Sequence, residues 1–94
     1  MDLLGDAQAA LALLDQAAAG GFPVPLWTRN GADAQRNRDI LIAYARGGVT
    51  QIELARFYQV TSERIRQIIG KERRYIELWC SRNRKFMARH GGDR

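Results

Sequence analysis

The side chains best suited to contact another molecule lie in one short stretch, between Ser62 and Lys71. Hydroxyl, carboxylate, amide and cationic groups recur there at spacings that place them on the outer side of a helix: Ser62, Glu63, Arg66, Gln67 and Lys71. Such groups bond to base edges and phosphates, and the major groove of DNA is wide enough to admit a helix. The stretch is therefore typical of a helix that contacts double-stranded DNA.

Other kinds of chemistry find little support in the sequence. Cys80 is the only cysteine and His90 the only histidine, so no internal disulfide and no zinc-ligand set can form, and a reducing compartment is expected. No Gly-rich phosphate loop or paired-carboxylate motif occurs. We therefore expect no enzyme activity, no metal and no cofactor.

A helix-turn-helix spanning residues 50–69 is predicted to position the candidate residues. Thr50 and Glu53 form the pattern of a capping box, so a first helix should begin at Gln51, and Thr61 is the candidate cap of the second helix. The apolar stripe of the first helix is Ile52, Leu54, Ala55 and Tyr58, which leaves Gln51, Glu53 and Arg56 outside. Ile65, Ile68 and Ile69 should face inward from the second.

A supporting helix is predicted over residues 33–46, with Ile40, Leu41 and Tyr44 facing inward. Its solvated side should carry Gln35, Arg36, Arg38 and Asp39. Gly47 and Gly48 should end it, and Val49 can pack as a hydrophobic staple before the Thr50 cap. This helix would complete a three-helix core.

An alanine-rich helix is predicted over residues 3–19, ended by Gly20 and Gly21. Its main apolar seam is Leu4, Ala7, Leu11, Leu14 and Ala18. The seam can pack on the helix-turn-helix body or form a homodimer contact. Residues 20–32 form an apolar linker and loop, in which residues 22–27 should lie as a strap against the core or, alternatively, bind a partner.

Beyond the helix-turn-helix, a helical extension over residues 70–88 is predicted, because Tyr75, Ile76 and Trp79 continue the inner face. Whether the helix runs through Gly70 is left open, since glycine weakens a helix without necessarily ending it. Arg74 is one of several cations that could extend a phosphate contact. Residues 89–94 are expected to form a flexible tail.

Charge is distributed unevenly along the 94 residues, which are enough for one small domain, 1–94. Residues 1–28 carry three acids and no Lys or Arg, whereas residues 29–94 carry 15 Lys and Arg against seven acids, a net charge of +8. This excess favours a polyanionic partner. The apolar run of residues 7–19 is interrupted by polar residues and lacks a basic leader, so a cytoplasmic protein without a membrane span is expected.

The helix-turn-helix resembles the fourth conserved region of bacterial primary sigma factors. Val60-Thr-Ser-Glu-Arg-Ile-Arg-Gln-Ile68 is similar to the family's Val-Thr-Arg-Glu-Arg-Ile-Arg-Gln-Ile and differs only at Ser62. Thr50-Gln-Ile-Glu-Leu-Ala is similar to the family's preceding helix, and Lys71 matches a family lysine. The resemblance covers about 30 of the 94 residues and is absent from residues 1–30 and from the C-terminal tail.

The resemblance implies base contacts from Glu63 and Gln67 and from the position of Ser62, where the family has an arginine. Because an arginine–guanine contact contributes about 1–3 kcal/mol of discrimination, the family's usual promoter hexamer should be read poorly. The resemblance further implies phosphate contacts from Thr61, Arg64, Arg66 and Lys71. The full set of candidates is Ser62, Glu63 and Gln67 for bases, and Thr50, Gln51, Thr61, Arg64, Arg66, Lys71 and Arg74 for phosphates.

Ile69 replaces a family glutamate and makes the helix more apolar than a solvated module needs, which indicates an added packing partner, either the N-terminal helix or a second subunit. The candidate homodimer contacts are Leu4, Leu11, Leu14, Ile69 and Ile76. The sequence thus predicts an all-α helix-turn-helix domain with an added N-terminal helix and an extended C-terminal helix.

Its expected function is that of a small stand-alone DNA-binding transcriptional regulator, phage- or plasmid-encoded, that acts as a dimer. The alternatives are a module that binds RNA polymerase or competes with sigma for it, and a DNA-packaging or replication accessory protein.

Overall fold

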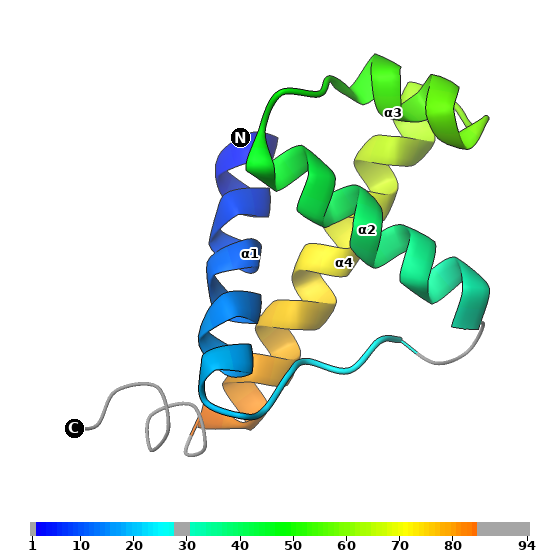
Figure 1. Cartoon of the computed structure of the whole chain (residues 1–94). Helices are drawn as coiled ribbons and strands as arrows, with labels where there is room; N and C mark the ends of the chain where they lie inside the picture. Colours follow the sequence, from blue (N-terminus) through cyan, green and yellow to red (C-terminus); the bar gives the residue numbers. More distant parts are fainter. Residues whose placement is uncertain (1, 28–30, 85–94) are drawn as a thin grey trace.

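Four helices and no strand make up the regular structure of residues 2–27 and 31–84, the part of the chain that the computed structural model describes. They are α1 (Leu3–Ala19), α2 (Gly31–Arg46), α3 (Gln51–Tyr58) and α4 (Ser62–Arg82). Figure 1 shows α1 beside α4, with α2 crossing α4 and α3 lying near the N-terminal end of α4. The predicted all-helical class is confirmed.

Helix α1 has the predicted limits, and its C-terminus is closed by two glycines. Gly21 lies at φ 84°, a left-handed conformation that suits glycine, and its N–H donates to the carbonyl of Ala18 at 3.0 Å. The helix packs against both α2 and α4 of its own chain. Of the two packing arrangements considered for α1, the one onto the body of the domain is therefore observed.

The predicted apolar seam of α1 is wrong in part. The fully buried residues are Ala7, Ala10 and Ala17, whereas Leu4 and Ala18 are exposed. Small side chains allow the backbones of two helices to approach closely, so the contact line follows these alanines. Leu11 and Leu14 flank that line and are half-buried against the core.

Helix α2 begins at Gly31, two residues before the predicted start, so the end of the predicted 20–32 loop is helical. Asp33 then lies in the first turn, where the positive end of the helix dipole favours an acid. The predicted loop residues 28–30 lie outside the described part of the chain. As predicted, the helix ends before Gly47 and Gly48, which lie at φ 82° and 88°.

Helix α3 buries a narrower stripe than predicted. Leu54 and Ala55 are buried, but Ile52 is 58% exposed. Residues two apart on a helix point about 160° away from each other, so Ile52 and Leu54 cannot both face the core. Gln51, predicted to lie on the outer side, is instead half-buried and donates from its amide to the Tyr44 hydroxyl at 3.4 Å.

Helix α4 runs without interruption through Gly70. Its continuous part reaches Arg82, where the Asn83 side-chain amide donates to the carbonyl of Trp79 at 2.8 Å. The predicted helical residues 85–88 and the tail 89–94 lie outside the described residues. The inward prediction for Ile65, Ile68 and Ile69 is confirmed, since at most 2% of each is exposed.

A buried ion pair joins α2, α4 and the segment 20–27, which we call the strap. Arg38 donates from Nε to Glu72 Oε2 at 2.7 Å, and from its two other nitrogens to the carbonyls of Val24 at 3.1 Å and Pro25 at 3.0 Å. Arg38 is 6% exposed and Glu72 4%. The predicted placement of Arg38 on the solvated side of its helix is therefore wrong.

The strap lies against the body of the domain, as predicted for its middle, where Val24 is buried in the core. Its last described residue, Trp27, is not buried in this way. Trp27 is 51% exposed, and its ring lies 5.4 Å from that of Tyr75 on α4. The strap therefore ends in an aromatic ring at the surface of α4.

Candidate nucleic-acid interface

Side-chain caps hold the starts of both α3 and α4. Thr50 Oγ1 accepts from the N–H of Glu53 at 3.1 Å, and Glu53 Oε1 accepts from the N–H of Thr50 at 2.8 Å, which confirms the predicted capping box. Thr61 Oγ1 accepts from the N–H of Arg64 at 3.0 Å, so the second predicted cap is also present. Between them, Gln59 adopts the left-handed conformation, with φ 59° and ψ 45°.

The buried isoleucines of α4 fix the rotation of the helix and so determine which residues face solvent. The exposed side carries a set that we call the α4 ridge: Glu63, Arg66, Gln67, Lys71 and Arg74. Glu63 and Gln67 lie about 40° apart around the helix axis and one turn apart along it. The ridge therefore presents two hydrogen-bonding side chains side by side, followed by cations toward the C-terminus.

The charges of the ridge fall into two groups. Arg66 and Glu63 form an exposed pair with two hydrogen bonds, one of them 3.1 Å long between Arg66 Nε and Glu63 Oε1. These bonds lower the pKa of the Glu63 carboxyl and raise that of the Arg66 guanidinium. Lys71 and Arg74 have no ion-pair partner among the described residues, so their charges are available to an anion.

Ser62, Thr50 and Gln51 lie apart from the ridge. Ser62 is about 140° around the helix axis from Gln67, and it borders a separate hollow of about 570 Å³ together with Thr50, Gln51 and Ile52. The structure thus brings the N-terminal ends of α3 and α4 together. Ser62 and Gln67 do not lie on the same side of α4. The three candidate base contacts, Ser62, Glu63 and Gln67, are nevertheless all exposed.

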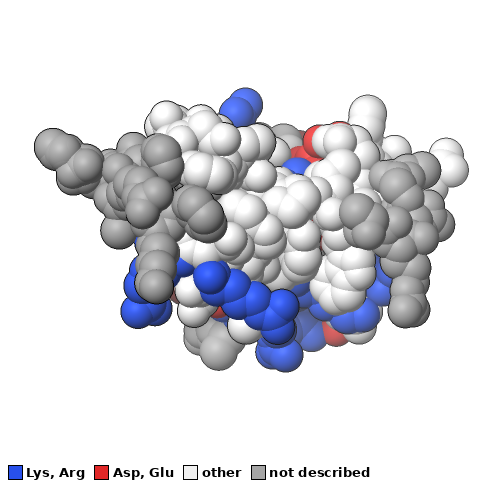
Figure 2. Space-filling model, turned by 90° about the horizontal axis from the view of Figure 1, so that it is seen from below, with Lys and Arg blue, Asp and Glu red and all other residues white. Residues whose placement is uncertain are grey.

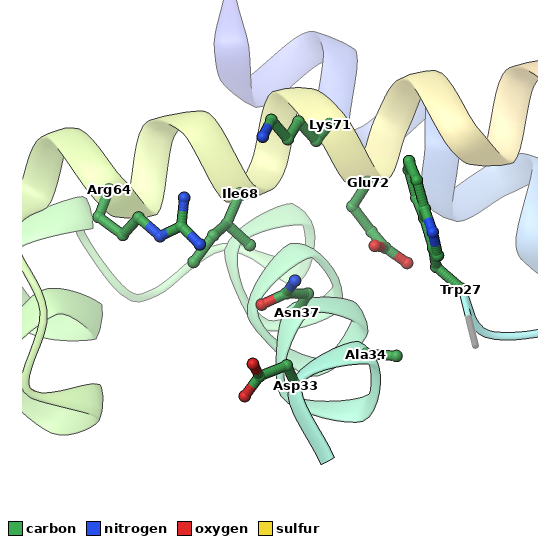
Figure 3. A pocket seen from close by; sticks show the side chains of 8 residues that line it. All are labelled: Trp27, Asp33, Ala34, Asn37, Arg64, Ile68, Lys71 and Glu72. Carbon is green, nitrogen blue, oxygen red and sulfur yellow. The ribbon is translucent and has the colours of Figure 1, made fainter. Parts of the chain in front are cut away.

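A cavity of about 330 Å³ lies between α4, the first turns of α2 and Trp27 (Figure 3). Arg64 and Ile68 line one end, and Trp27 stands beside Glu72 at the other. The cavity combines the cations of Arg64 and Lys71 with the acids Asp33 and Glu72, so its wall carries no excess of one charge. It therefore favours an anionic ligand less than the α4 ridge does.

Figure 2 shows Lys and Arg gathered along one edge of the face that it presents, next to a broad area with few charged side chains. Among the described cations on α4, Arg73 is engaged with the acids Asp6 and Glu77, at 3.9 and 2.9 Å. Lys71 and Arg74 are the better candidates for phosphate contacts.

The sequence reasoning missed Arg38, Glu72 and the exposed face of Trp27. The sequence did contain a signal for the ion pair. Arg38 falls on the same side of its helix as Ala34, Leu41 and Ala45, which follow one another at steps that match a helical turn and are all buried. Glu72 has the same relation to Ile65, Ile69 and Ile76. Two opposite charges, each on the buried stripe of its helix, are the pattern of a buried pair.

The prediction that Ile69 and Ile76 form dimer contacts is wrong. Both side chains are 0% exposed within the core of their own chain, so neither can reach a second subunit. The added packing partner that Ile69 indicated is α1, which packs along α4. Of the remaining three, Leu4 is 37% exposed, and Leu11 and Leu14 are half-buried.

Comparison with protein-family models, with curated proteins and with solved structures gave no match to this chain. Among the described residues, no helix is both long and apolar enough to cross a membrane. The function is therefore inferred from the geometry and charge of the surface itself.

Proposed function

We propose that the protein binds double-stranded DNA as a sequence-specific transcriptional regulator, with α3 and α4 as a helix-turn-helix and α4 as its recognition helix. The α4 ridge is the observation that carries the proposal. Its hydrogen-bonding side chains Glu63 and Gln67 are followed by the unpaired cations Lys71 and Arg74, all on the exposed side of a helix whose other side is buried in the core. The resemblance to the fourth region of sigma factors falls on the same residues.

The chemistry of the ridge fits the major groove. A glutamine amide can bond to both the N6 and N7 positions of adenine, and a glutamate carboxylate accepts from the N4 amine of cytosine. Cations further along the helix neutralise phosphates and release counterions, which supplies affinity without regard to sequence. In the free protein Glu63 is held by Arg66, so DNA binding exchanges that pair for contacts with bases and phosphates.

The test begins with selection of bound sequences from a random pool of duplex DNA. Affinities of wild type, Gln67→Ala and Lys71→Ala are then measured by fluorescence anisotropy on the selected and a scrambled duplex, at several salt concentrations. Gln67→Ala should lose about 1–3 kcal/mol on the selected duplex and little on the scrambled one. Lys71→Ala should weaken both duplexes and reduce the salt slope by about 0.9.

Arg46→Ala is the matched control, because Arg46 is an exposed cation at the end of α2, away from the ridge. It should leave both the affinity and the salt slope close to those of wild type. Arg66→Ala should also lower the salt slope, but it breaks the pair with Glu63 as well, so its effect is harder to assign to phosphate contact than that of Lys71→Ala. Equal losses on both duplexes for Gln67→Ala would refute base reading, and absence of binding at low salt would refute the proposal.

The proposed dimer now depends on α1 alone. A dimer would protect a near-palindromic site with half-sites about 34–36 Å apart, one helical turn. Leu4 is the most exposed of the remaining contact candidates, so Leu4→Gln should shift a measured dimer mass toward the monomer. A monomer mass for wild type, with protection of a single asymmetric site, would exclude the dimer.

A protein-binding role is supported by one separate observation. Phe57, on α3, is 78% exposed, with its ring 4.9 Å from that of Tyr58. Aromatic side chains, phenylalanine among them, are enriched in protein–protein interfaces. If the chain acts mainly by binding RNA polymerase, polymerase should be retained on the immobilised protein and lost with Phe57→Ser, while isolated DNA binding should be weak.

A further inference from the structure

A groove of about 610 Å³ continues the α4 ridge toward the C-terminus of the helix. One side is formed by the ridge residues Arg66, Gln67, Lys71 and Arg74. Its apolar part is formed by Trp27, Tyr75 and Leu78, and Gly70 lies within the ridge, between Arg66 and Arg74 around the helix axis. The groove therefore combines a cationic border with an exposed apolar wall, since Trp27 is 51% and Leu78 53% exposed.

Gly70 leaves this part of the groove open, and no contact within the chain explains why a glycine stands there. Glycine destabilises a helix interior relative to alanine, and Gly70 lies in the middle of α4. A Cβ added at this position would meet no atom within 4 Å, so no packing within the chain requires glycine there. The space it leaves opens into the groove, where a bound molecule could approach the helix backbone closely.

The apolar wall is held in place before any ligand arrives. The Trp27 ring packs on Tyr75, and the two residues before Leu26 are fixed by their carbonyls to Arg38, which is itself paired with Glu72 of α4. An exposed tryptophan fixed in this way loses little conformational entropy on binding. The groove is therefore a rigid feature of the surface.

We propose that this groove seats the sugar–phosphate backbone of the DNA strand that borders the major groove entered by α4. The inference rests on the proposed function. With a rise of about 1.5 Å per residue, Gly70 lies about 10 Å along the helix from Glu63, whereas the bases that Glu63 reads lie within a groove about 12 Å wide, so Gly70 falls near the edge of that groove. The bordering backbone therefore crosses α4 at Gly70, where the unpaired cations Lys71 and Arg74 meet its phosphates and Trp27 and Leu78 meet its deoxyriboses.

Gly70→Ala separates this role from a structural one. Alanine should stabilise the helix and raise the Tm by about 4–8 °C, yet its methyl group should obstruct the backbone and weaken binding to the selected duplex at least tenfold. Ser81→Ala is the matched control, because Ser81 is exposed on the same helix outside the groove and its replacement also favours helix. It should leave the affinity unchanged.

Hydroxyl-radical footprinting on the selected duplex locates the contact. Wild type should protect one backbone segment beside the bases that depend on Gln67. Both Gly70→Ala and Trp27→Ala should lose that protection while keeping the preference of wild type for the selected over the scrambled duplex. Failure of wild type to bind duplex DNA would overturn the proposed function and this inference together. Wild-type binding with unchanged affinity and footprint in Gly70→Ala and Trp27→Ala would overturn this inference alone.

Discussion

Replacing both members of the Arg38–Glu72 pair should destabilise the fold much less than the two single replacements added together. Each charge is more than nine-tenths buried, so Glu72→Leu leaves a guanidinium in the core without its carboxylate. Removing one partner of such a pair typically costs about 3–5 kcal/mol. Arg38→Met should lie at the upper end, because it also leaves the carbonyls of Val24 and Pro25 without their donors, at about 1 kcal/mol each.

These losses are large for a chain of this size, whose total stability is expected to be about 5–14 kcal/mol. A loss of 3 kcal/mol corresponds to a fall in Tm of about 12–24 °C. The double variant Arg38→Met/Glu72→Leu leaves no buried charge, so it should be less destabilised than the sum of the single variants by at least about 2 kcal/mol.

Urea unfolding followed by circular dichroism gives the free energy of unfolding of wild type, the two single variants and the double variant. The reasoning is refuted if either single variant costs less than about 1 kcal/mol, or if the two losses add within about 0.5 kcal/mol. Either result would mean that solvent reaches the pair in solution and screens it.

Three further predictions concern the caps of α3 and α4, the turn between them and the first turn of α4. Gln59→Gly should raise the free energy of unfolding by about 0.5–1 kcal/mol, because glycine adopts the left-handed conformation of this residue more readily; a lower value in urea unfolding would contradict the conformation. Thr50→Ala and Thr61→Ala should each cost about 1 kcal/mol by thermal unfolding, and two unchanged values would argue against the caps. Arg66 lowers the pKa of Glu63 below its ordinary value of about 4.5, so the pair stabilises the folded state above that pH and its contribution is lost as the pH falls through the lowered pKa. The stability difference between wild type and Glu63→Gln should therefore disappear in acid, and a difference that grew there would reverse the assignment.

The helix ends could be predicted because their signals are local. Thr50 and Glu53 are three residues apart and satisfy each other's backbone donors, so the start of α3 is contained in four residues of sequence. The same holds for Gly47 and Gly48, which end α2 in a conformation that favours glycine. Such signals act within one turn of chain and do not depend on the rest of the fold.

The predictions that were wrong depended on which other helix of the chain each surface packs against. The buried line of α1 could not be chosen from its own residues, because leucines and alanines offer several apolar seams and only the close approach of α4 selects Ala7, Ala10 and Ala17. The sequence leaves Ile69 with two possible packing partners, the N-terminal helix or a second subunit, because a helix-turn-helix alone does not bury it. The candidate base contacts stay predictions, because exposure allows contact with DNA without demonstrating it.

The Arg38–Glu72 pair is better explained by geometry than by stability. Apolar residues of similar volume often stabilise a core as well as a buried ion pair does, so burial energy alone gives no reason for the charges. A guanidinium, however, directs its donors in one plane, and Arg38 uses them to fix Val24, Pro25 and Glu72 relative to one another. Apolar contacts would allow the strap to slide along α4. The directed bonds hold the Trp27 end of the strap beside Tyr75 and near Lys71 of the ridge, which is the arrangement that the proposed contact with the DNA backbone requires.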